Sequence, residues 1–129
     1  HVARSIFVAD TDEEAAAFVA AGDSSYTYYY EYLFTIFDRA DFKGPFVANQ
    51  DDDPAELSAN KVRDACVIHG SPESVARKLL ALREEIGHFG TLLYAAHDWQ
   101  DKAAMKKSMR LMAEEVMPRV NQTLGAKAA

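Results

Sequence analysis

The sequence has 129 residues, a formal net charge of −6 and a pI near 5.1. Its composition, 49% hydrophobic and 26% charged, is typical of a soluble globular domain and not of a disordered chain. An acidic surface repels phosphate groups, so nucleic acid and anionic membranes are disfavoured as partners. No apolar run reaches the roughly 18 residues that span a bilayer, and no signal peptide is recognisable at residue 1, so a cytoplasmic location is expected.

The first third of the chain predicts one strand and two helices. Residues 4–9 are β-prone, and the acidic residues 10–14 supply caps and first-turn charges for a helix that ends at Gly22 in a left-handed conformation. Ser24 or Ser25 can cap a second helix that runs to about Asp38. Its apolar spacing predicts a buried face that contains Tyr26, Tyr29 or Tyr30, Leu33 and Phe37.

Residues 26–61 are expected to form an insertion of helix and loop. Gly44-Pro45 and the acidic residues 51–53 indicate a loop, and Asp53 with Pro54 predicts the start of another helix. The acidic run lacks the glycine and distal glutamate of a calcium-binding loop, so a solvated cap is the better interpretation.

Residues 66–121 predict strand, helix, strand, helix. Residues 66–69 form a short strand, after which Ser71 and Pro72 begin a helix that ends at Gly87. The nearly continuous apolar run 89–96 predicts a buried parallel strand. Asp101 begins the last helix, which Pro118 should end or kink. The two helices are expected to bury stripes at offsets 0, 4, 7 and 11, formed by Val75, Leu79, Leu82 and Ile86 and by Met105, Met109, Met112 and Val116.

The fold class predicted from this order is α/β with three parallel strands joined by right-handed crossovers. A whole (β/α)₈ barrel needs about 250 residues. The chain is therefore expected either to form a small open sheet or to belong to something larger. An incomplete sheet has unpaired edges, so self-association into a homo-oligomer is expected, and a non-catalytic module that assembles in this way is the alternative function.

Several segments in order resemble one family of enzymes. They are residues 8–11 (VADT), 70–76 (GSPESVA), 89–93 (FGTLL), 97–99 (HDW) and 108–118, which close with Met117-Pro118. Together they resemble the C-terminal part of bacterial luciferase-like, flavin-dependent monooxygenases. The resemblance implies that residues 1–129 are a single, helix-rich segment that supplies about the last three β/α units of a TIM (β/α)₈ barrel.

The resemblance also implies an enzyme that oxidises a small organic substrate with O₂ and reduced flavin. The implied cofactor is FMN, with a deazaflavin as the alternative and no metal. Because many flavin contacts in the family come from earlier strands, catalytic residues are not assigned, and the 129-residue segment alone is expected to be inactive.

Barrel active sites lie at the C-terminal ends of the strands, and this rule selects the candidate site residues. His97, Trp99 and Tyr94 are candidates for the rim of a substrate or flavin pocket, although Trp99 could instead pack as a hydrophobic staple beside a helix capped by Asp98 or Asp101. Gly70 and Ser71 could contact a phosphate, or could simply cap the helix.

Three other features of the sequence have a possible functional interpretation. Tyr28 and Tyr29 belong to a tyrosine cluster in the insertion that could form a lid over the substrate, or pack in the core and at contacts. Glu85 and His88 form a single Glu-x-x-His motif, whereas a di-iron site needs two. Cys66 is the only cysteine, which excludes a disulfide within the chain and predicts a small buried side chain.

Overall fold

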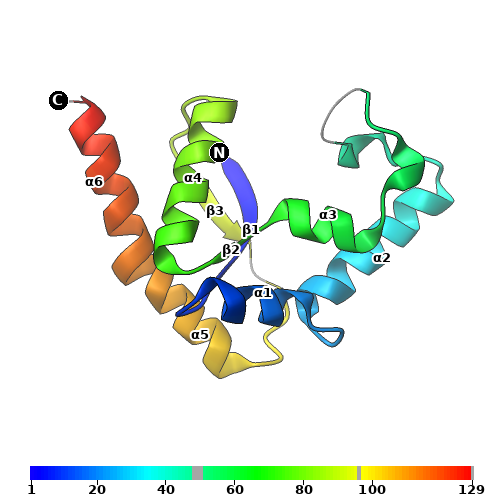
Figure 1. The fold of residues 1–129 in the computed structure, drawn as a ribbon, viewed down its shortest axis with the longest axis horizontal. Helices are drawn as coiled ribbons and strands as arrows, with labels where there is room; N and C mark the ends of the chain where they lie inside the picture. Colours follow the sequence, from blue (N-terminus) through cyan, green and yellow to red (C-terminus); the bar gives the residue numbers. More distant parts are fainter. Residues whose placement is uncertain (48–50, 96, 129) are drawn as a thin grey trace.

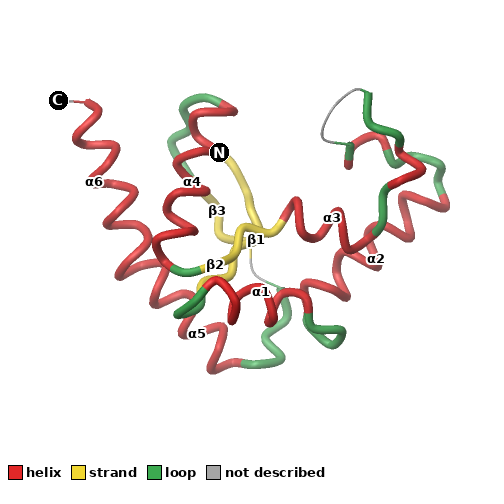
Figure 2. Tube along the Cα trace, viewed as in Figure 1, coloured by secondary structure: helices red, strands yellow, loops and turns green. Residues whose placement is uncertain are grey.

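The computed structural model describes residues 1–47, 51–95 and 97–128. Three short strands lie at the centre, and six α-helices surround them (Figures 1 and 2). The strands are β1 (Val2–Val8), β2 (Val67–Gly70) and β3 (Leu92–Ala95). The helices are α1 (Asp12–Ala20), α2 (Ser25–Arg39), α3 (Ala59–Cys66), α4 (Pro72–Ile86), α5 (Lys102–Leu111) and α6 (Met117–Ala128).

The sheet is parallel throughout, as predicted, and its order is β2-β1-β3. Ser5 pairs with Val67 on one side and with Ala95 on the other, so β1 is the central strand. Three successive units of a sequential barrel would instead have the second strand between the first and the third. Among the described strands, β2 and β3 each keep one unpaired edge.

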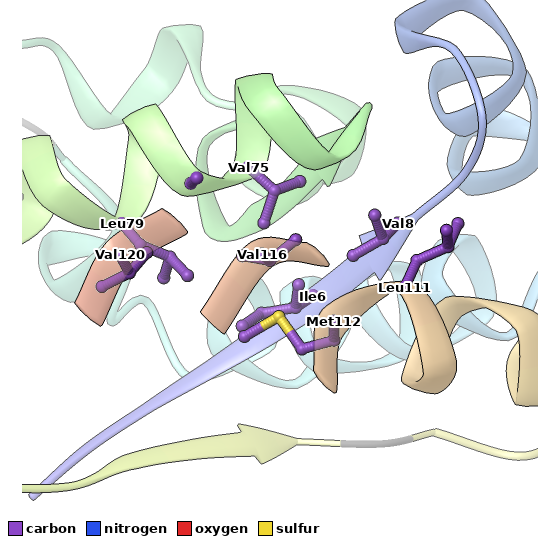
Figure 3. Packing of buried hydrophobic residues seen from close by; sticks show 9 residues of the cluster. Ile6, Val8, Val75, Leu79, Leu111, Met112, Val116 and Val120 are labelled. Atoms are coloured by element: carbon purple, nitrogen blue, oxygen red, sulfur yellow. The ribbon is translucent and has the colours of Figure 1, made fainter. Parts of the chain in front are cut away.

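Alternate residues of β1 enter two separate cores. Ile6 and Val8 point toward α4 and the C-terminal helices, where they form the first core cluster (Figure 3). Phe7 and Ala9 point the other way, into the second core cluster around α1 and α2. The first cluster consists of Ile6, Val8, Val75, Ala76, Leu79, Leu111, Met112, Val116 and Val120. The second consists of Phe7, Ala9, Ala15, Val19, Tyr26, Tyr30, Val62, Val67 and Met105.

The helix starts follow the capping residues that the sequence provides. Ser24, Ser71 and Asp101 accept hydrogen bonds from backbone N–H groups at the starts of α2, α4 and α5. Asp53 and Pro54 begin only a 3₁₀ turn (Pro54–Glu56), because the next α-helix begins after its own cap, Ser58. Gly87 ends α4 with a φ of 86°, as predicted.

Two predicted details of the helix ends are wrong. The helix α1 ends at Ala20, with Ala21 as its C-cap, and Gly22 has no positive φ. Cys66 is the last residue of α3 and not the first of the strand, and its side chain is half-buried. The helix α3 passes directly into β2, so Cys66 lies next to the strand in sequence and a strand pattern that begins one residue early includes it.

The last helix does not end at Pro118. A π turn (Met112–Val116) joins α5 to α6 just before the proline. The ring of Pro118 would clash with the carbonyl of Glu114, four residues back, and a wider turn accommodates such a break in the hydrogen-bond ladder. The predicted stripe also changes, because Met109 is 44% exposed and Ser108 is fully buried in its place. The Ser108 hydroxyl faces inward because it accepts a hydrogen bond of 2.8 Å from the Val8 N–H.

The third strand is less buried than predicted. Leu93 is 55% exposed, since β3 is an edge strand with one face open. Ile86, the last member of the predicted α4 stripe, is also exposed because α4 extends beyond the sheet at that end, whereas Val75 and Leu79 are buried. Ala96, at the end of the predicted strand 89–96, lies outside the described residues.

Gly70 is required by the turn from β2 to α4. Its φ is 147°, and an added Cβ would lie 2.6 Å from Asp12 Oδ1. We expect Gly70→Ala to lower the free energy of unfolding by about 1–3 kcal/mol, measured by chemical denaturation. Gly22→Ala is the matched control, since its added Cβ meets no atom within 4 Å, and a change within about 0.5 kcal/mol is expected. Equal effects of the two variants would contradict this reading of the turn.

Candidate functional site

His97 is the centre of a polar and aromatic group between β1, β3 and α2. Its Nε2 lies 3.0 Å from Ser5 Oγ, which in turn lies 3.3 Å from the Tyr30 hydroxyl. The rings of Tyr26 and Tyr29 lie 4.9 and 4.6 Å from the imidazole, between centroids. The sheet and the first two turns of α2 therefore fix the imidazole from several sides.

Burial changes the acid–base properties of this group. It lowers the pKa of His97, against a smaller opposing effect from the charge of Asp98. Burial also raises the pKa of Tyr26 and of Tyr30 above the usual phenol value. At neutral pH the group therefore consists of a neutral imidazole and protonated phenols, and of these His97 and Tyr30 line the neighbouring pocket, whereas the Tyr26 hydroxyl donates to the carbonyl of Ile6.

A pocket of about 430 Å³ opens beside His97. We call it the His97 pocket; it lies between the strands β1 and β3 and the helices α2 and α3, and its size is in the range of ligand sites. Three alanines line the pocket with small apolar side chains. Ser5, Tyr29, Tyr30 and His97 supply the polar atoms and aromatic rings. The complete lining is Ala3, Arg4, Ser5, Tyr29, Tyr30, Ala65, Cys66, Ala95 and His97.

A second pocket of about 350 Å³ adjoins the first. Tyr28 and Tyr29 line it together with His97 and Asp98, so the two predicted lid tyrosines and the predicted rim histidine lie in one place. Tyr29 and His97 belong to both pockets and form the wall between them. Tyr28 is exposed and stacks on Tyr32, with centroids 6.4 Å apart.

The other two predicted rim residues lie elsewhere. Trp99 packs against the second core cluster, which matches its alternative interpretation as a staple. Tyr94 points to the opposite face of the sheet, where it packs on the first core cluster and its hydroxyl lies 2.8 Å from Ser108 Oγ. Neither residue lines the His97 pocket.

The predicted phosphate position at the start of α4 holds a carboxylate of the chain itself. Asp12 accepts hydrogen bonds from the Ser71 N–H at 2.6 Å and from the Ser74 hydroxyl at 2.7 Å. These bonds, the Ser71 N–H first, lower the pKa of Asp12 to about 2. The geometry therefore does not support a phosphate contact at Gly70 and Ser71, because Asp12 already supplies the anion there.

The Asp12 contact makes stability depend on pH in the acid range. Its pKa is about 2 in the folded chain against 3.8 for the free side chain, so its contribution is present above about pH 4 and is lost as the pH falls toward about 2. Thermal melts across this range should show a smaller fall in melting temperature for Asp12→Asn than for the wild type. Glu13→Gln removes the neighbouring charge and should leave the slope as in the wild type; equal slopes in all three would contradict the assignment.

Three residues with important contacts, two beside His97 and one at the start of α4, have no distinctive local sequence pattern. Ser5 lies inside an apolar strand, Tyr30 is one of several adjacent tyrosines, and Asp12 is one of several acids in a first helical turn. Their partners are 25 to 92 residues away in sequence, so no local pattern distinguishes them. The alternation of β1 places Ser5 on the same face as Phe7, which is the only sequence signal for its position.

Residues 1–47, 51–95 and 97–128 contain no group of three or more His, Cys, Asp or Glu side chains that could hold a metal ion. Within the same ranges, no helix combines the length and the apolar character needed to cross a membrane.

Comparison with known proteins relates this fold to flavin-dependent Baeyer–Villiger monooxygenases. A solved structure of the oxygenating constituent of 3,6-diketocamphane monooxygenase from Pseudomonas putida, a type II Baeyer–Villiger enzyme in complex with FMN, superposes with a TM-score of 0.77. It is 33% identical over 92% of this chain and 33% of that one. No family model matches the sequence.

Curated relatives agree with the structural match. The 3,6-diketocamphane 1,6-monooxygenase of P. putida is 33% identical over 120 residues, and the 2,5-diketocamphane 1,2-monooxygenase 2 of the same species is 32% identical over 122 residues. These matches cover 92% of this chain but only about a third of each relative. The resemblance to flavin-dependent monooxygenases that the sequence motifs indicated is therefore confirmed, and the chain is homologous to one part of such enzymes.

Proposed function

We propose that this chain is part of a longer flavin-dependent monooxygenase that inserts oxygen from O₂ into a small cyclic ketone. The observation that carries the proposal is the FMN-bound relative, which matches at a TM-score of 0.77 and 33% identity. The cyclic ketone is inferred from the diketocamphane substrates named for the relatives. FMN is the proposed cofactor and a deazaflavin the alternative.

The described residues fit one part of such a cofactor and not another. The His97 pocket, with alanine walls and the Tyr29 ring, suits a flat and largely apolar ring, whether of a flavin or of a ketone. The start of α4 does not suit the FMN phosphate, because Asp12 occupies its N–H group. We therefore assign the phosphate contacts to residues outside this chain.

In the proposed reaction a bound reduced flavin supplies the activation of O₂. The residues of this chain bind and orient the ketone. The Tyr29 and Tyr30 rings and the alanines exclude water from it, and His97 offers a ring nitrogen to its polar end. No acid or base in the described residues is assigned a proton transfer with the substrate.

We also propose that the complete protein closes the sheet into a barrel and that residues 1–129 alone are inactive. The unpaired edges of β2 and β3 are where further strands could add. The order β2-β1-β3 differs from that of a sequential barrel, in which β2 would lie between the other two strands, so the proposed closed sheet has another strand order at this point. A structure of the complete protein in which these three strands are not part of a closed sheet would contradict the proposal.

Binding of flavin is the direct test of the cofactor. Reduced FMN, and separately a reduced deazaflavin, is titrated anaerobically into the complete protein while flavin fluorescence is recorded. One of the two is expected to bind saturably, with about one flavin molecule bound per protein chain. Absence of saturable binding of both would rule out the flavin enzyme.

A specific observation favours the second candidate, a non-catalytic module that self-associates. Leu93 is 55% exposed on the uncovered face, beside Ala3 in the neighbouring strand. Sedimentation velocity of the 129-residue chain separates the cases. Concentration-dependent dimers that Leu93→Lys abolishes would support association through this face, and a monomer with a cooperative melt would exclude it.

A further inference from the structure

Ser5 lies between a phenol and an imidazole, and it has only one proton to donate. Tyr30 is on one side at 3.3 Å and His97 Nε2 on the other at 3.0 Å. A phenol is the strongest hydrogen-bond donor of the three groups, and an unprotonated imidazole nitrogen is the strongest acceptor. The favourable arrangement is therefore Tyr30 O–H to Ser5 Oγ, and Ser5 O–H to His97 Nε2.

This arrangement fixes the tautomer of His97. If Nε2 accepts from Ser5 and the ring is neutral, the ring proton must be on Nδ1. Burial favours the neutral ring by lowering the pKa of His97, and it keeps Tyr30 protonated by raising the pKa of its phenol. Among the described residues, Ser5 is the only one that hydrogen-bonds the imidazole.

The Nδ1–H group of His97 that results from this tautomer is suited to donate a hydrogen bond to a neutral oxygen acceptor. One charged residue, Arg4, lines the pocket, and its guanidinium donates to the carbonyl of Ala3 at 2.9 Å, while Asp98 lines the adjoining pocket. The remaining lining is formed by alanines, tyrosines, Ser5 and Cys66. A mostly apolar molecule with a single carbonyl oxygen matches a wall of this kind with one N–H donor.

We propose that His97 Nδ1–H donates a hydrogen bond to the carbonyl oxygen of a ketone in the His97 pocket, and that Ser5 and Tyr30 are positioning residues that fix this tautomer. The choice of a ketone rests on the proposed function, whereas the tautomer rests on the hydrogen bonds alone. The ketone would thus be oriented by its oxygen, with its ring against the alanines.

The ketone contact is tested on the complete protein without flavin, with norcamphor as the probe. The carbonyl stretch of bound norcamphor is recorded by infrared difference spectroscopy for the wild type, His97→Asn and His97→Gln. An asparagine amide reaches the position of Nδ1 and a glutamine amide that of Nε2. We expect a carbonyl stretch at lower wavenumber in the wild type and His97→Asn, and norcamphor binding about tenfold weaker in His97→Gln.

The same carbonyl stretch and the same affinity in all three proteins would overturn the contact. Tyr32→Phe is the control, since Tyr32 is exposed on α2 and lines neither pocket, and it should behave as the wild type. The norcamphor measurement contains no flavin. Failure of the flavin titration with a shifted carbonyl stretch would therefore reject the proposed enzyme and leave the ketone contact standing.

The positioning role is tested by the tautomer itself. Nitrogen-15 NMR of histidine-labelled protein should show the Nδ1–H form of His97 in the wild type and a mixture of tautomers in Ser5→Ala. Tyr30→Phe should give an intermediate result, because Ser5 remains but loses its donor. A merely structural role would lower the melting temperature of Ser5→Ala without changing the tautomer. An Nε2–H form in the wild type would overturn the proposed direction of the hydrogen bonds.

Discussion

Replacing Tyr26 with alanine is expected to lower the free energy of unfolding by about 3–5 kcal/mol. Tyr26 is fully buried in the second core cluster, and its hydroxyl donates a 2.9 Å hydrogen bond to the carbonyl of Ile6 in the central strand. Its ring also meets Phe7 edge-on, at 6.1 Å between centroids. The substitution therefore leaves a cavity between α2 and the sheet and an unpaired carbonyl in β1. Urea denaturation followed by circular dichroism measures the change.

Tyr26→Phe separates the two causes. It keeps the ring and removes only the hydroxyl, so a loss of about 1 kcal/mol is expected. Because the ring of Tyr26 also contacts His97, Tyr26→Ala should disturb the His97 pocket, whereas Tyr26→Phe should not. If the phenylalanine variant were as unstable as the alanine variant, the hydrogen bond to Ile6 and not the packing would be the main contribution.

Ile6→Ala is expected to lower the free energy of unfolding by about 2–5 kcal/mol. Ile6 has no exposed surface and lies in the first core cluster, where the central strand meets residues of α4 and of the C-terminal helices (Figure 3). The same denaturation measurement applies.

Leu93→Ala is the matched control for Ile6→Ala, since it removes a similar side chain from an edge strand at a 55% exposed position. A change of no more than about 0.5 kcal/mol is expected. A large loss in Leu93→Ala would mean that its face is covered in solution, which would favour self-association through the open sheet.

Local patterns predicted the elements of this fold better than their arrangement. Capping residues such as Ser24 and Ser71 act within one helical turn, so their role could be read from the sequence. The position of β1 between β2 and β3 depends on contacts between distant segments, and no local pattern carries it. The burial of Ser108 in place of Met109 has the same origin, since the Val8 N–H that it binds is 100 residues away.

For the candidate site too, the sequence predicted some of the residues correctly and missed those that depend on distant contacts. The position of His97 after the last strand pointed to a pocket, and the structure brings it together with Tyr28 and Tyr29. Tyr94 was predicted at the same rim, but the alternation of a strand sends it to the opposite face, toward Ser108. The phosphate prediction did not anticipate Asp12, whose carboxylate reaches the Ser71 N–H from another helix.

The incorporation of labelled oxygen tests the central claim most directly. The complete protein is supplied with reduced FMN, a bicyclic ketone and ¹⁸O₂, and the products are analysed by mass spectrometry. The proposed function predicts a lactone that carries a single ¹⁸O atom from O₂, formed more slowly by His97→Gln than by the wild type. Recovery of unchanged ketone, while the flavin is reoxidised by O₂ alone, would contradict it.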